Sequence, residues 1–372
     1  MACDYLQLAT AGVQGLHPYL PGKPIAELER EYGVSNIIKL ASNENPLGSS
    51  PAAVNAVRGG LDELWLYPDA NGFELKQALS SQLDVTPDCI TLGNGSNDVL
   101  VLLAEAWLSP AHNAVFSQYC FAVYPIATQA AGAEARIAPA LPADSDMPLG
   151  HDLQAMATRI DADTRLVFVA NPNNPTGTWL DNTELRDFVA NVPETCLVVI
   201  DEAYLEYAGE GQGSDAAAWL VEFPNLVVTR TFSKAYGLAG LRVGYALSSP
   251  QIAAVLNRVR QPFNVNVLAL LAAEAALTDH DFLQRTKTAN DQGMQQLQSG
   301  LKDLGMSTIP SAGNFILVDM GREAMPVYDA LLQRSVIVRP VGNYGLDRHL
   351  RITIGTQAQN ATLLNALADV YS

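Results

Sequence analysis

The stretch Thr231-Phe-Ser-Lys-Ala-Tyr-Gly-Leu-Ala-Gly-Leu-Arg242 directly follows the apolar run Leu226-Val-Val-Thr. Short runs of this kind, rich in β-branched residues, predict buried strands. Similar runs start at Leu166 and Leu197, at intervals of about thirty residues, and an earlier one starts at Ala114. The chain therefore contains a series of short buried strands through its middle.

Segments with helical patterning separate these strands. Residues 181–189 predict such a helix, with a capping box at Asn182 or Thr183. The alternation predicts an α/β fold in which helices cover both faces of a mostly parallel sheet. From about residue 270 the pattern changes to helices followed by further strands, which predicts a smaller α+β domain. We expect a large domain at residues 40–268 and a small domain built from residues 1–39 plus 269–372.

A polar cluster follows each of the last three predicted strands. Residues 171–177 (Asn-Pro-Asn-Asn-Pro-Thr-Gly) follow the first, Asp201-Glu-Ala-Tyr204 follows the second, and Thr231 to Lys234 follow the third. Ligands of parallel sheets bind beyond the carboxyl ends of the strands. The sequence therefore predicts a ligand site at this edge of the sheet.

The third cluster combines a lysine with groups that bind phosphate. The ε-amine of Lys234 can condense with a carbonyl group to form a Schiff base. Thr231, Ser233 and the planar guanidinium of Arg242 suit a phosphate dianion. Pyridoxal 5'-phosphate carries both an aldehyde and a phosphate. A Ser-Lys pair by itself is more often a solvated surface feature, so this interpretation depends on the other motifs.

Two further motifs suit the same cofactor. Gly93-Asn-Gly-Ser-Asn97 precedes a helical run, so the backbone around Gly95, Ser96 and Asn97 can bind a phosphate at the helix N-terminus; an ordinary capped turn is the alternative. Asp201 ends a run that is apolar enough to be buried, and a buried carboxylate needs a cationic partner such as a protonated pyridine nitrogen. A helix cap is the alternative for this aspartate.

Four more residues complete the candidate cofactor site. Tyr204 and Asn174 can hydrogen-bond the phenolic oxygen of the cofactor, although both also suit a turn or a helix start. Phe121 and Tyr124 follow the strand that starts at Ala114, and one of them can stack on the pyridine ring. Core packing is the alternative role for either aromatic ring.

Two arginines lie within predicted strands of the C-terminal region. Arg351 stands in the apolar run Leu350-Arg-Ile-Thr-Ile, where a cleft-facing guanidinium would bind a carboxylate bidentately. Arg339, in Val336-Ile-Val-Arg, offers a second anion site. A position on the surface of the sheet is the alternative for both.

Composition excludes several other functions. The formal net charge of −17 over 372 residues argues against nucleic acid or an anionic membrane as a partner. The four cysteines are widely spaced, and the chain has no H-E-x-x-H, G-x-S-x-G or Walker motif, so we expect no metal site, disulfide framework or serine triad. With no signal-like N-terminus or long apolar span, we expect a cytoplasmic protein.

With these residues in place, the chain resembles the class I/II, fold-type I aminotransferases that use pyridoxal phosphate. The resemblance covers nearly the whole length. The general motifs are Asn174-Pro-Thr-Gly177, Asp201-Glu-Ala-Tyr204, Ser233-Lys234, Arg242 and Arg351. Residues 17–24 (His-Pro-Tyr-Leu-Pro-Gly-Lys-Pro), 40–48 (Leu-Ala-Ser-Asn-Glu-Asn-Pro-Leu-Gly) and 67–69 (Tyr-Pro-Asp) narrow the match to the histidinol-phosphate branch and its near relatives.

The resemblance implies a seven-stranded, mostly parallel sheet and a role for each motif residue. Lys234 would form the Schiff base, Asp201 would pair with the pyridinium nitrogen, and Tyr204 would contact the phenolic oxygen together with Asn174. Phe121 would stack on the ring, although residues 117–124 depart from the commoner Pro-Thr-aromatic form. The implied cofactor-phosphate ligands are Gly95, Ser96, Asn97, Thr231, Ser233, Arg242 and, from the partner subunit of a homodimer, Tyr67. The implied substrate ligands are Tyr19, Asn45, Asn174, Arg339 and Arg351.

The function implied by this branch is ping-pong transamination in histidine biosynthesis. L-Histidinol phosphate and 2-oxoglutarate would be interconverted with imidazole acetol phosphate and L-glutamate. Two alternatives stay open, an aromatic amino acid or phenylpyruvate aminotransferase and a threonine-phosphate decarboxylase, because both resemble this branch.

Overall fold

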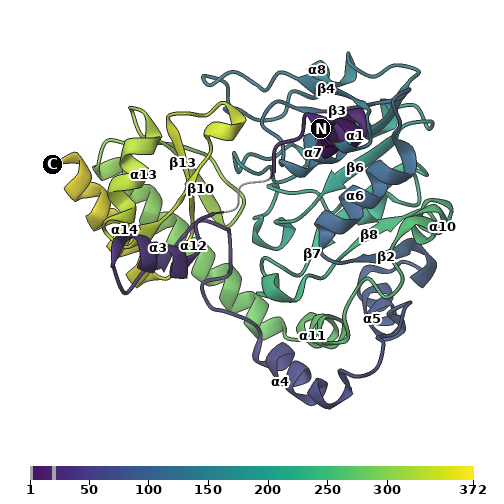
Figure 1. The fold of residues 1–372 in the computed structure, drawn as a ribbon, viewed down its shortest axis with the longest axis horizontal. Coiled ribbons are helices and arrows are strands. Elements are labelled where there is room, and N and C mark those ends of the chain that lie inside the picture. Colours follow the sequence, from purple (N-terminus) through teal and green to yellow (C-terminus); the bar gives the residue numbers. More distant parts are fainter. Residues whose placement is uncertain (1–2, 19–21) are drawn as a thin grey trace.

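A computed structural model describes residues 3–18 and 22–372, and its centre is a seven-stranded sheet (Figure 1). The strand order is β2-β8-β7-β6-β5-β3-β4, and β8 alone runs antiparallel to its neighbours. The expected mostly parallel sheet of seven strands is confirmed. The strands are β2 (Ile90–Gly93), β3 (Asn113–Ser117), β4 (Glu134–Ala138), β5 (Thr164–Ala170), β6 (Leu197–Asp201), β7 (Leu226–Thr231) and β8 (Gly244–Ser248).

Both faces of this sheet are buried under helices. Neighbouring strand residues point to opposite faces, so Val167 belongs to one apolar cluster with α5, α9 and α11, whereas Phe168 belongs to a second cluster with α6, α7 and α10. This two-sided burial explains why the strands are continuous apolar runs. The covering helices are α5 (Phe73–Leu83), α6 (Ser96–Trp107), α7 (Val123–Ala130), α9 (Asn182–Asn191), α10 (Pro250–Val259) and α11 (Val267–Leu277).

The start of α9 corrects the expected cap. Asp181, rather than Asn182 or Thr183, is the N-cap, and its side chain accepts hydrogen bonds from the amides of Thr183 and Glu184. A carboxylate has no proton to share and accepts from two amides at once, which favours Asp181 at this position.

The C-terminal part of the chain forms a second layered unit. Its antiparallel sheet has the order β12-β13-β10-β9 and packs against three helices around a separate apolar core. The long helix α12 runs from this unit toward α11 and the large sheet (Figure 1). The elements are α12 (His280–Asp303), β9 (Ser307–Ile309), β10 (Phe315–Asp319), α13 (Ala324–Leu332), β11 (Val336–Ile337), β12 (Arg339–Pro340), β13 (His349–Thr353) and α14 (Gln357–Tyr371).

The N-terminal residues contact both units. The helix α2 (Ala11–Gln14) contacts α7, whereas β1 (Ile38–Lys39) pairs in parallel with β11 and α3 (Ile25–Tyr32) buries Leu28 against the same region. The domain limits at residues 40 and 269 stay a prediction. The remaining elements are α1 (Tyr5–Leu8), α4 (Pro51–Gly59), α8 (Leu153–Ala157) and the 3-10 turns η1 (Leu61–Glu63), η2 (Pro87–Cys89), η3 (Leu205–Tyr207), η4 (Ala216–Trp219), η5 (Ala239–Leu241) and η6 (Gly342–Tyr344).

A strap, residues 40–43, crosses between the two units. Its four consecutive backbone carbonyls each accept a hydrogen bond from a different part of the molecule. The donors are the amide of Thr353 to Leu40, Nη2 of Arg351 to Ala41, Nζ of Lys234 to Ser42 and Nδ2 of Asn314 to Asn43. The strap thus joins β13, β10 and the loop after β7 through its main chain.

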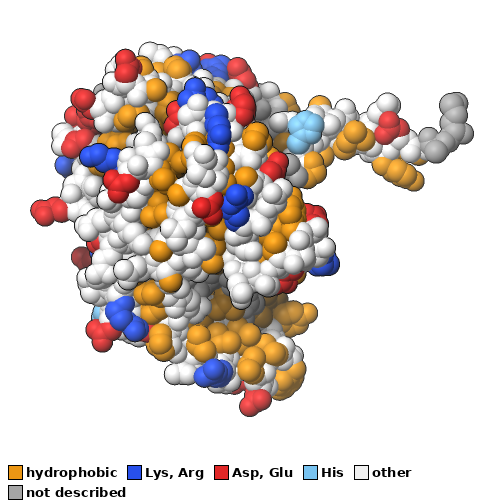
Figure 2. Space-filling model, turned by 90° about the vertical axis from the view of Figure 1, so that its left-hand side faces the viewer, with side chains coloured by type: hydrophobic (Ala, Val, Ile, Leu, Met, Phe, Trp, Pro, Cys, Tyr) orange, Lys and Arg blue, Asp and Glu red, His pale blue; other side chains and the backbone are white. Residues whose placement is uncertain are grey.

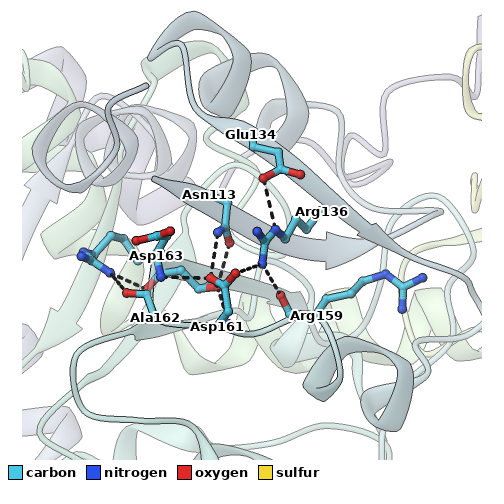
Figure 3. A network of polar contacts seen from close by, with 9 residues as sticks. Asn113, Glu134, Arg136, Arg159, Asp161, Ala162 and Asp163 are labelled. Carbon is cyan, nitrogen blue, oxygen red and sulfur yellow. Dashed lines mark hydrogen bonds and ion pairs between the residues drawn. The ribbon is translucent and has the colours of Figure 1, made fainter. Parts of the chain in front are cut away.

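Polar groups at the amino edge of the large sheet are satisfied among themselves (Figure 3). Asp161 forms an ion pair with Arg136 on β4 and accepts a hydrogen bond from Asn113 at the start of β3, at 3.1 Å. These contacts hold the pKa of Asp161 well below its usual range. The network ties β3, β4 and the start of β5 together.

Across residues 3–18 and 22–372, no helix has the length and apolar character to span a membrane.

Candidate active site

The candidate active site is a cavity at the carboxyl ends of β5, β6 and β7, the edge that the polar clusters predict. Ten of the residues singled out in the sequence line it, together with three small or cyclic residues from the same loops. The lining residues are Ser96, Asn97, Phe121, Ala170, Pro172, Asn174, Asp201, Ala203, Tyr204, Thr231, Ser233, Lys234 and Arg242.

Lys234 lies in the loop after β7 with its amine buried in this cavity. Nζ donates a hydrogen bond to the carbonyl oxygen of Ser42 at 3.0 Å. Burial, and then the nearby positive charge of Arg351, lower the pKa of Lys234 to about 7. A large fraction of this amine is therefore neutral near pH 7, as a nucleophile or a proton acceptor must be.

Asp201, the last residue of β6, is a buried carboxylate. Its Oδ2 accepts a hydrogen bond from the hydroxyl of Tyr124 and its Oδ1 accepts one from Thr229, both at 2.9 Å. Burial raises its pKa, and no ion pair joins it to a cation of the described residues. A ligand cation in the cavity would supply the charge that these neutral donors do not.

A candidate anion-binding subsite lines the same cavity. The helix α6 begins at Ser96 directly after Gly95, so its free amide groups and dipole favour a negative charge. Nη1 of Arg242 donates to Oγ of Ser233 at 3.3 Å. A Cβ atom at Gly95 would lie 2.6 Å from Nη2 of Arg242, so glycine is required for the arginine to reach this place.

The predicted pair Tyr204 and Asn174 is held by the strap and by β13. Nη1 of Arg351, on β13, donates to Oδ1 of Asn174 at 2.5 Å. Nδ2 of Asn43 donates to the Tyr204 hydroxyl at 2.9 Å. The pKa of Tyr204 is raised to about 12, chiefly by burial, so its hydroxyl keeps its proton.

The structure also separates the two candidate stacking residues. Phe121 lines the cavity, whereas Tyr124 is fully buried beneath it. Tyr124 stacks on Phe168 with 4.7 Å between ring centroids and uses its hydroxyl to hold Asp201. Of the two rings, Phe121 is therefore the one that faces the cavity.

Four predicted site residues lie elsewhere or outside the description. Nδ2 of Asn45 donates to the carbonyl of Ala235 and to Thr286, so the amide of Asn45 serves the packing beside the cavity. Tyr67 is exposed and stacks on Phe263. Arg339 lines a neighbouring cavity. Tyr19 lies outside the described residues.

Sequence reasoning missed two side chains that hold the site residues in place, Asn43 and Thr229, and the role of the Tyr124 hydroxyl. Asn43 is buried and bonds Tyr204; it lies in the quoted segment 40–48, where Asn45 was chosen instead. Thr229 bonds Asp201 from the neighbouring strand, and period-2 alternation along β7 could have indicated it. The hydroxyl of Tyr124 gave no signal because its partner is distant in sequence.

One cavity at this sheet edge thus combines a lysine of lowered pKa, a buried carboxylate and a candidate anion subsite. Residues 35–367 match the model of the family "Aminotransferase class I and II", and the chain belongs to this family.

Individual relatives are more specific. Histidinol-phosphate aminotransferase 2 of Pseudomonas fluorescens (strain Pf0-1) is 58% identical over 374 residues, covering 100% of both chains. The protein of the same name from Methylococcus capsulatus is 59% identical over 97% of each chain. The crystal structure of histidinol-phosphate aminotransferase from Sinorhizobium meliloti in complex with pyridoxal-5'-phosphate matches with a TM-score of 0.89 and 30% identity, over 97% of each chain.

Proposed function

We propose that this protein is a pyridoxal-phosphate-dependent aminotransferase that acts on L-histidinol phosphate and 2-oxoglutarate in histidine biosynthesis. The observation that carries the proposal is the shared cavity of Lys234, Asp201 and Arg242 at the carboxyl edge of the sheet. The full-length similarity to histidinol-phosphate aminotransferases supports the choice of substrate.

The cavity residues fit the cofactor group by group. The buried carboxylate of Asp201 would pair with a protonated ring nitrogen, because it has no cationic partner among the described side chains. The N-terminus of α6 with Arg242, Ser233 and Thr231 would hold the phosphate. Asn174, with Tyr204, would hydrogen-bond the phenolic oxygen. When bound, this cofactor supplies an aldehyde for the substrate amine and a ring that accepts electrons.

Lys234 is the proposed base of the reaction. Nζ would remove the proton from the substrate Cα, and a pKa of about 7 suits an amine that must both accept and return a proton near neutral pH. The carbonyl of Ser42 accepts a hydrogen bond from Nζ and keeps the amine in the cavity. A Lys234→Ala variant that kept steady-state turnover would refute this assignment.

Two arginines are proposed to bind the two kinds of anionic substrate. Arg339 and Arg351 are direct register partners on β12 and β13, so their side chains leave the same face of the small sheet. Arg351 contacts Asn174 and would bind the carboxylate of glutamate. Arg339 lines the neighbouring cavity, and its guanidinium suits the phosphate of histidinol phosphate.

We also propose a cytoplasmic homodimer. Exposed apolar side chains gather on α4, η1 and the residues after them, at the lower end of the molecule where Figure 2 shows a cluster of hydrophobic side chains. Trp65 and Tyr67 are 81% and 82% exposed. Large exposed patches of this kind mark interfaces, and Tyr67 would reach the cofactor phosphate of the partner subunit. Sedimentation analysis of a Trp65→Glu variant, with a shift to monomer expected, tests this.

The choice of amino substrate is tested by the loss of yellow absorbance from the holoenzyme in the absence of any keto acid. The protein is mixed in turn with L-histidinol phosphate, L-phenylalanine, L-glutamate and L-threonine phosphate. We expect a low concentration of histidinol phosphate to remove the yellow absorbance and phenylalanine to have a much weaker effect. An equal or stronger response to phenylalanine would make the protein an aromatic aminotransferase, and release of carbon dioxide from threonine phosphate would make it a decarboxylase.

A further inference from the structure

The hydroxyl of Tyr204 receives a hydrogen bond on its oxygen. The donor is Nδ2 of Asn43 at 2.9 Å, and both residues are buried. Because the amide donates, the phenolic oxygen uses a lone pair in this contact and the hydroxyl proton points elsewhere. Tyr204 lines the cavity, so its proton is available to a ligand there.

The direction of the Asn43 amide is fixed by its other contacts. The backbone amide of Asn43 donates to Oγ1 of Thr353 at 2.9 Å, and the hydroxyl of Thr353 donates its single proton to Oδ1 of Asn43 at 3.1 Å. The carbonyl of Asn43 accepts from Nδ2 of Asn314. Oδ1 is therefore the acceptor toward β13, which leaves Nδ2 to face Tyr204.

The backbone of Asn43 is also unusual. Its φ angle is 55°, in the left-handed region that asparagine tolerates better than most residues. A buried residue in this conformation, bonded at each of its polar groups, has a single orientation. The second unit thus determines which way the amide points into the site.

We propose that Asn43 is a positioning residue that directs the hydroxyl proton of Tyr204 onto the phenolic oxygen of the cofactor. The inference rests on the proposed function. A hydroxyl that accepts a hydrogen bond also becomes a stronger donor, so Asn43 increases the stabilisation of negative charge on that phenolic oxygen. Without this stabilisation the bound cofactor binds its proton more tightly. The midpoint pH of its deprotonation therefore rises.

The side chain of Asn43 bonds Tyr204 and Thr353, and charged groups lie around this contact. They are Asp201 on β6, Lys234 after β7 and Arg351 on β13. A change in the protonation midpoint can therefore be assigned to the hydrogen bonds of Tyr204 if it disappears when that hydroxyl is absent.

The experiment is a double-mutant cycle read by the visible absorbance of the holoenzyme as a function of pH. Asn43→Gly removes the amide and tolerates the positive φ angle, and Tyr204→Phe removes the hydroxyl. We expect Asn43→Gly to raise the midpoint by about half a unit, and Tyr204→Phe to raise it by about one unit. In the Tyr204→Phe background, Asn43→Gly should cause no further shift.

Two results would overturn the inference: an Asn43→Gly midpoint equal to that of the wild type, or additive shifts in the double variant. If Tyr204→Phe itself leaves the midpoint unchanged, the placement of the cofactor fails instead. Asn360→Ala is the matched control, because it removes a buried asparagine that bonds Gly355, Gly293 and Gln296 and contacts neither Tyr204 nor the cavity. This control should lower the melting temperature and leave the midpoint in place.

Discussion

His151 makes the stability of the fold depend on pH. Its Nε2 bonds the carbonyl of Ala170 at 3.0 Å, so this nitrogen carries the proton of the neutral ring. Its Nδ1 is buried with no partner among the described residues. Protonation would place a second N–H and a positive charge in this apolar setting, and burial lowers the pKa of His151 from 6.5 to about 4.

The sign and size of the effect follow from this lowered pKa. Between pH 6.5 and pH 4, His151 is protonated in the unfolded chain but stays neutral in the folded chain. The free energy of unfolding therefore falls as the pH falls from 6.5 toward 4. At 1.36 kcal/mol per unit, the loss is about 2 kcal/mol at pH 5 and about 3 kcal/mol below pH 4. Above pH 6.5 the residue costs nothing.

The assay is urea unfolding followed by circular dichroism at several pH values between 4.5 and 7.5. Other groups titrate in this range, so wild type is compared with His151→Gln, whose amide can donate to Ala170 and does not titrate. The free energy of unfolding of the wild type should fall by about 2 kcal/mol relative to that of His151→Gln between pH 6.5 and pH 5. Parallel curves over the whole range would refute the reasoning.

Three further predictions concern the site and its surroundings. Glu206 is half-buried, its Oε2 is inaccessible and has no partner among the described residues, and this desolvation raises its pKa to about 7. The folded chain therefore loses stability as the pH rises from 4.5 through 7, and Glu206→Gln should raise the melting temperature at pH 8 but not at pH 4.5. Gly95→Ala would place Cβ against Arg242 and should weaken cofactor binding about tenfold in equilibrium dialysis; Gly211→Ala, with an equally positive φ angle but open space around it, should leave binding unchanged. Arg351→Lys keeps the positive charge but loses the paired N–H donors of the guanidinium. Steady-state kinetics should therefore show a KM for glutamate about tenfold higher and a smaller increase in the KM for histidinol phosphate.

Local patterns predicted the large sheet and the polar residues at its edge. The strands are buried on both faces, so they stand out as apolar runs, and residues such as Asp201 and Lys234 follow those runs directly. The contacts that hold these residues could not be predicted, because they join distant segments. Asn43 and Thr353 are an example: 310 positions separate them in the chain, and neither carries a local signal.

The same reasoning explains the choice of Asn45 over Asn43. Both stand in one short polar segment, and local pattern cannot show which amide faces the cavity and which faces the neighbouring packing. In the fold, Asn45 bonds Ala235 and Thr286, whereas Asn43 bonds Tyr204. Residues two positions apart in extended backbone would face the same side, but Asn43 has a left-handed φ angle of 55°, so the two amides meet different surroundings.

The strap limits which sequence changes this chain can accept during evolution. At Leu40, Ala41 and Ser42 the bonding groups are main-chain carbonyls, which every amino acid provides. Side-chain substitutions there leave the carbonyl acceptors in place. Inserting or deleting one residue would instead shift each acceptor by about 3.3 Å, away from its own donor and toward that of a neighbouring residue. The spacing between β1 and the residues beyond the strap is therefore constrained by main-chain bonding, in addition to the packing of the buried side chains of Leu40 and Ala41.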